Sequence, residues 1–163
     1  MIFVTTGTQA PFNRLILAMD EIAAELGEEV IAQASGVDFP VKNLKIVEFL
    51  NPTEYKRIFK ESKMVISHAG MGTIISALKD KKPILIVPRV AALGEHRNEH
   101  QYATAKKIEE LGYMPVVYDM VDLKDKVISL RDDAEHYVLP AMGDLASVSL
   151  IQSLQEFISK DKL

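Results

Sequence analysis

The chain alternates between two patterns of hydrophobic and polar positions. Short apolar runs rich in branched residues are typical of buried strands, and segments with apolar residues three and four positions apart are typical of helices. We predict strands over residues 2–5, 29–33, 44–49, 64–67, 84–87 and 114–117. We predict helices over residues 13–26, 52–61, 72–79, 99–111, 123–130 and 140–160.

Several predicted strands are apolar on both faces, among them Val65-Ile66 and the run 84–87, which suits a parallel sheet covered by helices on each side. Strands that alternate with helices along the whole chain predict an α/β fold built on a single Rossmann-like, doubly wound parallel sheet. In such a fold ligands bind at the carboxyl ends of the strands, near the point where the strand order reverses. The segments that follow the strands are therefore where the chemistry is expected.

Composition narrows the class of protein. The chain has 163 residues, of which 48% are hydrophobic, and we predict one domain over residues 1–163. The net charge of −4 gives no reason to expect a nucleic-acid partner, and the absence of cysteine excludes disulfides and thiolate zinc sites. The sequence enters a strand at Ile2 with no basic leader, and it has no apolar run of about 20 residues, so we expect a cytoplasmic protein.

The segment Ser67–Thr73 is the most informative motif. It reads Ser-His-Ala-Gly-Met-Gly-Thr and joins a buried strand to a helical pattern. Glycines at such a turn let the backbone approach a ligand, and the first amides of the helix point at it with the positive end of the helix dipole behind them. His68 and Thr73 add two polar side chains at the same place. The turn therefore predicts a phosphate site, although a turn that only packs a helix on a sheet would have a similar sequence.

Two further strand-end segments are polar. A turn rich in hydroxyl groups, Thr6–Gln9, follows the first strand and offers a second anion site. Arg89 follows the fifth strand, as either a surface cation or a charge partner for a diphosphate, and the polar segment 95–101 comes next. Together with the segment Ser67–Thr73, these segments contain three of the four histidines.

Other binding motifs fit less well. A dinucleotide fingerprint needs a third glycine where Ile75 stands, and a P-loop needs a Gly-Lys-Ser/Thr ending that is absent. The string from His96 through Glu99 to His100 matches a zinc-peptidase pattern, which would require both histidines on one helix face. These residues are also typical of a solvated first helical turn.

The C-terminal segment carries an apolar stripe at helical spacing, formed by Leu145, Val148, Ile151, Leu154, Phe157 and Ile158. We expect it to pack on the sheet of its own domain, and a docking face for another chain is the alternative.

Taken together, these motifs resemble the C-terminal, nucleotide-sugar-binding half of family 28 glycosyltransferases. The closest likeness is to small stand-alone versions of that half, the PssE-type subunits of exopolysaccharide and capsule synthesis and the catalytic subunit of the split eukaryotic transferase that extends dolichol-linked sugars. The likeness runs in order over residues 1–112. The matching segments are 3–9, 11–12, 15–16, 67–74, 77–78, 82–83, 86–89, 94–96, 98–101 and residue 105.

The resemblance implies the donor-binding half of a GT-B fold and assigns residues to parts of a UDP-sugar. The residues implied at the nucleotide and diphosphate are Gly7, Thr8, Gln9, Phe49, Leu50, His68, Ala69, Gly70, Met71, Gly72, Thr73 and Arg89, with Phe49 and Leu50 near the uracil. The residues implied at the sugar are Glu95, His96, Asn98, Glu99, His100 and Gln101. Larger members hold the ribose with a glutamate where this chain has Ser76.

The implied function is that of the catalytic, donor-binding subunit of an inverting UDP-sugar transferase. His68 and His100 are the candidate bases, and no metal or cofactor is implied beyond the UDP-sugar itself. The implied partner is a membrane-anchored, acceptor-binding subunit that presents a lipid-linked sugar and holds this chain at the inner face of the membrane. The alternative is an accessory subunit that binds the partner but not the donor.

Overall fold

The computed structural model describes residues 1–139. The helix predicted over residues 140–160 and its apolar stripe lie outside the described residues. No described helix is both long and apolar enough to cross a membrane.

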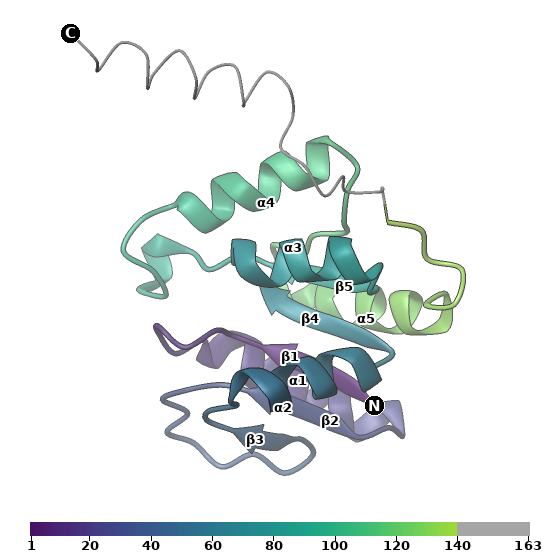
Figure 1. The fold of residues 1–163 in the computed structure, drawn as a ribbon. Helices are drawn as coiled ribbons and strands as arrows, with labels where there is room; N and C mark the ends of the chain where they lie inside the picture. The colour runs from purple at the N-terminus through teal and green to yellow at the C-terminus, as the bar shows by residue number, and fades with distance from the viewer. Residues whose placement is uncertain (140–163) are drawn as a thin grey trace, which may run out of the picture.

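A single parallel sheet forms the centre of the molecule (Figure 1). Its strands are β1 (Ile2–Thr5), β2 (Val30–Gln33), β3 (Lys45–Val47), β4 (Met64–His68) and β5 (Ile84–Val87). They lie in the order β3-β2-β1-β4-β5, and every pair is parallel. The predicted doubly wound α/β fold is therefore confirmed.

The strand predicted over residues 114–117 is reduced to an isolated bridge between Val116 and Ile86. Ile86 N–H donates to Pro115 O at 3.0 Å, and Val117 N–H donates to Ile86 O at 2.8 Å. Toward the N-terminus, the next bond of a parallel ladder would need an amide at position 115. Proline has none, so the ladder cannot extend in that direction.

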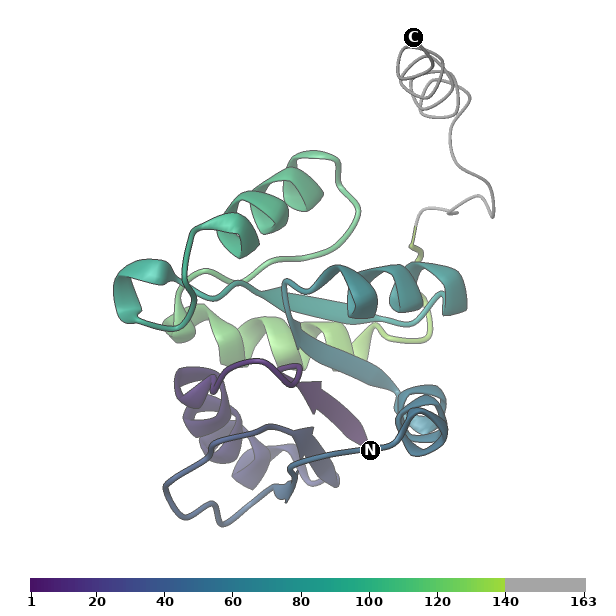
Figure 2. The same ribbon diagram turned by 60° about the vertical axis from the view of Figure 1, so that its left-hand side comes forward.

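Helices cover both faces of the sheet (Figures 1 and 2). One face carries α1 (Asn13–Leu26) and α5 (Leu123–Asp132), and the other carries α2 (Pro52–Glu61), α3 (Met71–Asp80) and α4 (His100–Glu110). Alternate residues of β1 enter opposite layers of the core, because Ile2 and Val4 pack toward α1 while Phe3 packs toward α2. Two short 3-10 turns, η1 (Ala91–Leu93) and η2 (Met120–Asp122), complete the described part.

The start of α2 is fixed by local hydrogen bonds. The Asn51 side chain accepts from the amides of Thr53 and Glu54, the Glu54 carboxylate accepts from the Asn51 amide, and Pro52 occupies the first turn. This capping box satisfies donors that the first turn of a helix leaves free. It also anchors the end of the loop that carries Phe49 and Leu50 beside α2.

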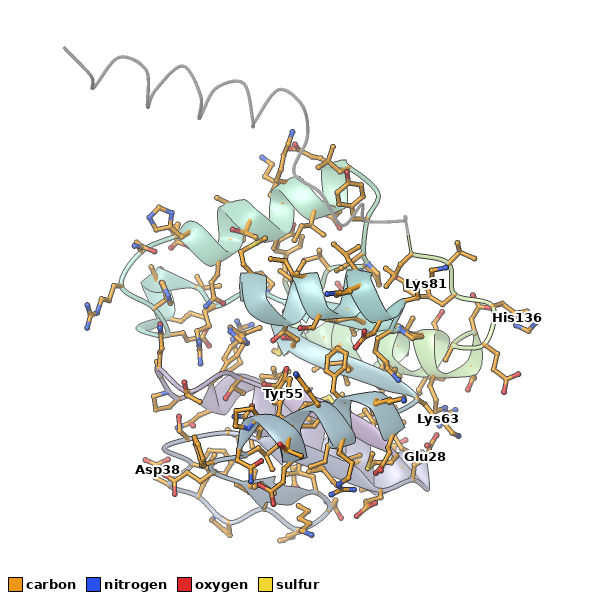
Figure 3. All side chains as sticks on the ribbon, in the orientation of Figure 1. Glu28, Asp38, Tyr55, Lys63, Lys81 and His136 are labelled. Atoms are coloured by element: carbon orange, nitrogen blue, oxygen red, sulfur yellow. The ribbon has the colours of Figure 1, made fainter. Side chains whose placement is uncertain are left out.

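The strand order reverses between β1 and β4. The chain runs outward from β1 through β2 to β3 and then returns to form β4 on the other side of β1. The loops that leave β1 and β4 therefore diverge at their carboxyl ends, which opens a crevice at this edge. At the opposite edge an ion pair joins Lys63 to Glu28 at 3.3 Å (Figure 3). The fold thus places the two predicted phosphate turns at its switch point.

Candidate functional site at the switch point

The turn after β4 presents unpaired backbone amides. Gly70 N–H turns back to the carbonyl of His68 at 2.8 Å, and α3 begins at Met71. Within residues 1–139 the amides of Met71, Gly72 and Thr73 have no acceptor, as expected for the first turn of a helix. A Cβ added at Gly72 would meet no atom within 4 Å, so the backbone there borders open space. This arrangement can receive an anion.

The loop after β1 forms the other wall of the crevice. Thr6 N–H continues the sheet by donating to the Gln33 carbonyl at 3.0 Å. Gly7 then turns the chain with a φ of +71°, a conformation that favours glycine. Thr8 and Gln9 are exposed, and their amides donate no hydrogen bond to any described residue. A second set of donors therefore faces the first across the switch point.

His68 sits between the two turns. A Cβ at Gly7 would lie 3.0 Å from ring atoms Cε1 and Nε2, and a Cβ at Gly70 would overlap the ring. The ring atom Nδ1 lies 3.3 Å from the Thr5 carbonyl. Because a carbonyl only accepts, this contact assigns the proton to Nδ1 and leaves Nε2 with a lone pair in the neutral ring.

The protonation state of His68 follows from its surroundings. Burial first, and then the nearby charge of Arg89, lower the pKa of His68 to about 4, so the imidazole is neutral at pH 7. A neutral ring whose Nδ1–H is committed to Thr5 has no donor left for a phosphate oxygen. The geometry therefore disagrees with His68 as a diphosphate donor and suits it as an acceptor or base.

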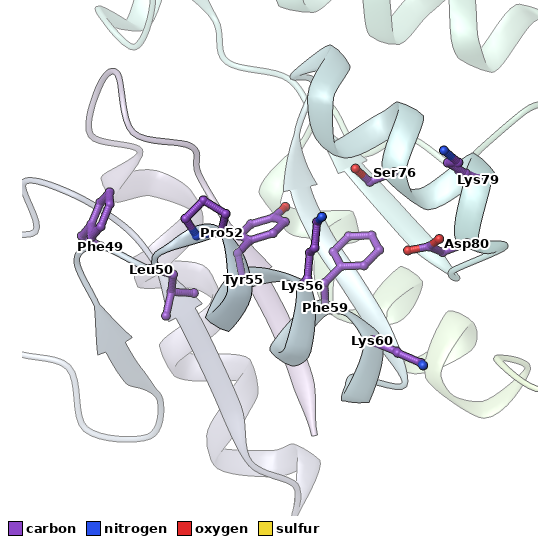
Figure 4. A pocket seen from close by; sticks show the side chains of 10 residues that line it. All are labelled: Phe49, Leu50, Pro52, Tyr55, Lys56, Phe59, Lys60, Ser76, Lys79 and Asp80. Carbon is purple, nitrogen blue, oxygen red and sulfur yellow. The ribbon is translucent and has the colours of Figure 1, made fainter. Parts of the chain in front are cut away.

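A pocket of about 620 Å³ opens between α2 and α3 (Figure 4). It brings together Phe49, Leu50 and Ser76, the residues that the family resemblance places along a nucleoside. Tyr55 and Phe59, whose rings stack at 5.9 Å between centroids, add aromatic surface from α2. The remaining lining residues are Pro52, Lys56, Lys60, Lys79 and Asp80. A flat ring and a ribose are of the right size and polarity for this pocket.

Ser76 has its own partner inside α3. Its hydroxyl donates to the Gly72 carbonyl at 2.9 Å, which is the local bond that serines commonly make within helices. Tyr55, which sequence reasoning missed, projects from α2 into the pocket (Figure 4). Its hydroxyl lies 3.4 Å from that of Thr73. Burial raises the pKa of the Tyr55 phenol. Tyr55 thus links the pocket to the turn after β4.

A second pocket of about 590 Å³ lies on the other side of the crevice, between the β1 loop and the loop after β5. Four predicted site residues line it, Gln9 from the first loop and Glu95, His96 and Asn98 from the second. Because β3 and β5 are the two edge strands, the two turns fall between this pocket and Phe49. The first pocket, the two turns and the second pocket therefore follow one another along the crevice. This order matches that of the nucleoside, the diphosphate and the sugar in a nucleotide sugar.

Two predicted sugar contacts instead hold the loop in place. The Glu95 carboxylate binds Arg14 in a two-pronged ion pair, at 2.7 Å to Nε and 2.9 Å to Nη2, and also accepts from the Val90 amide at 2.9 Å. The Glu99 carboxylate accepts from the Ala91 amide at 3.1 Å. The sequence missed Arg14 as a partner because 81 positions separate it from Glu95.

The last members of the predicted set differ in exposure. His100 is exposed at the first position of α4, and its amide donates to Asn98 Oδ1 at 3.2 Å. Gln101 is buried, and its Oε1 accepts from the Arg89 amide at 3.2 Å. Ala69 is also buried and packs in the core with its side chain. Of these, only His100 presents its side chain at the surface.

The zinc alternative required a helix through residues 96–100. The helix begins at His100, and His96 lies in the preceding bend with Nδ1 turned toward Asn98. The two histidines therefore do not share a helix face. Among residues 1–139, no three His, Asp or Glu side chains gather closely enough to hold a metal ion. The helix predicted over residues 99–111 is confirmed to within one residue at each end, and the zinc alternative lacks the helical spacing that it requires.

The fold and the crevice define a doubly wound α/β domain with unpaired backbone amides at its switch point. The model of the glycosyltransferase family 28 C-terminal domain matches residues 1–152, and the chain belongs to this family.

Curated relatives agree with the family. The chain is 27% identical over 117 residues to the UDP-N-acetylglucosamine transferase subunit ALG13 of Eremothecium gossypii, covering 71% of this chain and 56% of that one. It is 35% identical over 72 residues to the subunit of the same name from Saccharomyces cerevisiae, covering 44% and 34%. The chain thus spans about half the length, or less, of these relatives.

Solved structures share the fold. A kitacinnamycin glycotransferase superposes with a TM-score of 0.61 at 18% identity, covering 82% of this chain and 36% of that one. An ALG13 solution structure gives 0.54 at 20% identity, covering 94% and 93%. Acinetobacter baumannii MurG gives 0.54 at 18% identity, covering 98% and 49%. At these identities the likeness shows a glycosyltransferase fold of the GT-B type.

Proposed function

We propose that this chain is the donor-binding, catalytic subunit of a two-component inverting UDP-sugar glycosyltransferase. Its acceptor is a lipid-linked sugar in exopolysaccharide, capsule or glycolipid-oligosaccharide synthesis, presented by a membrane-anchored partner subunit. The partner holds the chain at the cytoplasmic face of the membrane. The names of the curated relatives make UDP-N-acetylglucosamine the first donor to test.

The single observation that carries the proposal is the pair of unpaired amide sets at the switch point. One set comprises Thr8 and Gln9 after β1, and the other comprises Met71, Gly72 and Thr73 at the start of α3. In the proposed reaction the acceptor oxygen bonds to the anomeric carbon, the bond to UDP breaks, and UDP leaves with the electron pair. Amides fixed in advance stabilise the charge that develops on the departing diphosphate.

The acceptor hydroxyl must also lose a proton. Nε2 of neutral His68 has a free lone pair close to both turns and is our first candidate to accept it. His100, exposed at the start of α4 beside the second pocket, is the other candidate. These roles rest on the placement of the side chains relative to the crevice.

Calorimetric titration with UDP tests the donor site. We expect the chain to bind UDP, and Gly72→Val to weaken binding by at least about tenfold because a branched side chain would fill the space beside the first helical amides. The control is Ser129→Val on the exposed side of α5. Unchanged affinity in a folded Gly72→Val protein would contradict the proposal.

A non-catalytic accessory subunit is the second candidate. It is favoured by Ser76, which stands where larger members of the family hold the ribose with a glutamate. The Ser76 hydroxyl donates its hydrogen bond to the Gly72 carbonyl and not to a ligand. The same titration separates the two, since an accessory subunit would bind its partner but not UDP.

A further inference from the structure

Arg89 lies in an unusual place for a cation. It directly follows β5 and is only 2% exposed. Its Nη2 donates to the Thr6 carbonyl at 2.8 Å and to the Ala10 carbonyl, at the two ends of the β1 loop. Its guanidinium also sits 5.2 Å from the centroid of the Phe12 ring. The side chain therefore lies beneath the loop and does not reach the open crevice as a ligand.

The charge of Arg89 is poorly compensated. Glu95 attracts it, but the Glu95 carboxylate is already bound by Arg14 and the Val90 amide. Within the described part of the chain, Arg89 Nε is buried and has no acceptor. A buried cation without a close carboxylate raises the positive potential around it, because the low-dielectric interior screens it weakly. The lowered pKa of His68, due to burial and then to Arg89, indicates that this field reaches the crevice.

Arg89 also determines which backbone groups of the loop are free. By binding the carbonyls of Thr6 and Ala10, it occupies acceptors that would repel an anion. The amides of Thr8 and Gln9 remain unpaired between these two anchored carbonyls. At the same time the Arg89 amide is held by Gln101, which ties the arrangement to α4. One residue thus fixes the loop from β5 and leaves its donors unoccupied.

We propose that Arg89 is a positioning residue for the diphosphate. It holds the β1 loop in its anion-binding conformation and supplies a fixed positive charge behind it, without touching the ligand. This inference rests on the proposed function, because it concerns how the same site binds its donor. It replaces the expectation that Arg89 contacts the diphosphate directly.

Comparison of UDP with uridine tests the inference, since only UDP carries the phosphates. We expect Arg89→Met to weaken UDP binding by at least about tenfold, because the loop amides lose both their anchor and the positive charge behind them, while uridine affinity changes by less than about twofold. Arg89→Lys keeps the charge but loses the planar fork, so we expect a smaller loss for UDP and none for uridine. Arg57→Met on the exposed face of α2 is the matched control and should change neither.

The outcomes are distinguishable. Equal losses for UDP and uridine, or no loss for either, would overturn the role of Arg89. If Arg89→Met does not fold, Arg89→Lys decides, with the amide NMR signals of Thr8 and Gln9 as a second readout. A selective loss for UDP with shifted signals supports the inference, and wild-type affinity with unshifted signals overturns it. Failure of the wild-type chain to bind UDP would instead contradict the proposed function.

Discussion

At the scale of single residues, the two glycines of the turn after β4 have different purposes. The sequence predicts that both let a ligand approach the backbone. A side chain at Gly70 would overlap the His68 ring, so this glycine makes room for the histidine. Gly72 borders open space and keeps the role that the sequence predicts. The motif shows that room is needed, whereas the three-dimensional position of the His68 ring shows what occupies it.

His68 makes stability depend on pH. Its folded pKa of about 4 lies below the ordinary histidine pKa of 6.5, so between these values the unfolded chain binds a proton that the folded chain does not. Stability therefore falls as the pH is lowered from 7 to 4, by about 3 kcal/mol from this residue. Denaturant unfolding at several pH values should show the decline, and His68→Asn should remove this part of it.

The titration of His68 can also be followed directly. The NMR signal of its ring Cε1–H should shift with a midpoint near pH 4. His136→Asn, which changes an exposed histidine far from the crevice, serves as the control variant for the unfolding series. A midpoint of His68 near 6.5 would show that its ring is hydrated and not enclosed by the two turns.

At the scale of elements, the loop between β5 and α4 is attached to α1 at several points. Arg14 donates to the Pro88 carbonyl at 3.2 Å as well as to Glu95, and Glu95 in turn accepts from the Val90 amide. A charge-assisted, two-pronged pair of low exposure has a defined geometry and keeps its strength better than a surface pair. The second pocket is therefore shaped before any ligand arrives.

Hydrogen exchange should separate the two carboxylates of this loop. In Glu95→Ala the Val90 amide loses its acceptor, and we expect its exchange to accelerate by at least about tenfold, since protection follows the local opening free energy. In the matched variant Glu99→Ala only the Ala91 amide loses its acceptor and should accelerate. Equal protection of Val90 in wild type and Glu95→Ala would show that the ion pair does not hold the loop.

The elements differ in how far the sequence determines them. Periodicity and caps predict α1 and α2 to the residue, because Gly27 ends the first helix and Pro52 begins the second. Periodicity fails at residues 114–117, where an apolar run favours a strand but Pro115 prevents the hydrogen-bond ladder with β5 from extending toward the N-terminus. Periodicity also does not reveal how the loop before α4 is held, because the hydrogen bonds that the Glu95 and Glu99 carboxylates accept leave no local pattern.

At the scale of the whole molecule, the site lies along the carboxyl ends of the parallel strands. The two turns and both pockets are built from the loops at the carboxyl ends of the strands and the adjoining helices. The chain covers 36% of the kitacinnamycin glycotransferase and 49% of A. baumannii MurG. More than half of each of those chains therefore has no counterpart here, and under the proposed function the acceptor-binding part comes from a second component.

The isolated chain should therefore show donor binding without sugar transfer. We expect the isolated chain to bind UDP yet transfer almost no N-acetylglucosamine to a lipid-linked acceptor, because in the proposed arrangement the partner subunit positions the acceptor hydroxyl. Adding the acceptor-binding subunit should raise turnover by at least about 100-fold, within the range that orientation of two reactants can supply. Gly72→Val combined with the same subunit is the control, since turnover that persists there would come from another enzyme. Robust turnover by the purified chain alone would refute the two-component arrangement, because an acceptor site would then have to lie within these 163 residues.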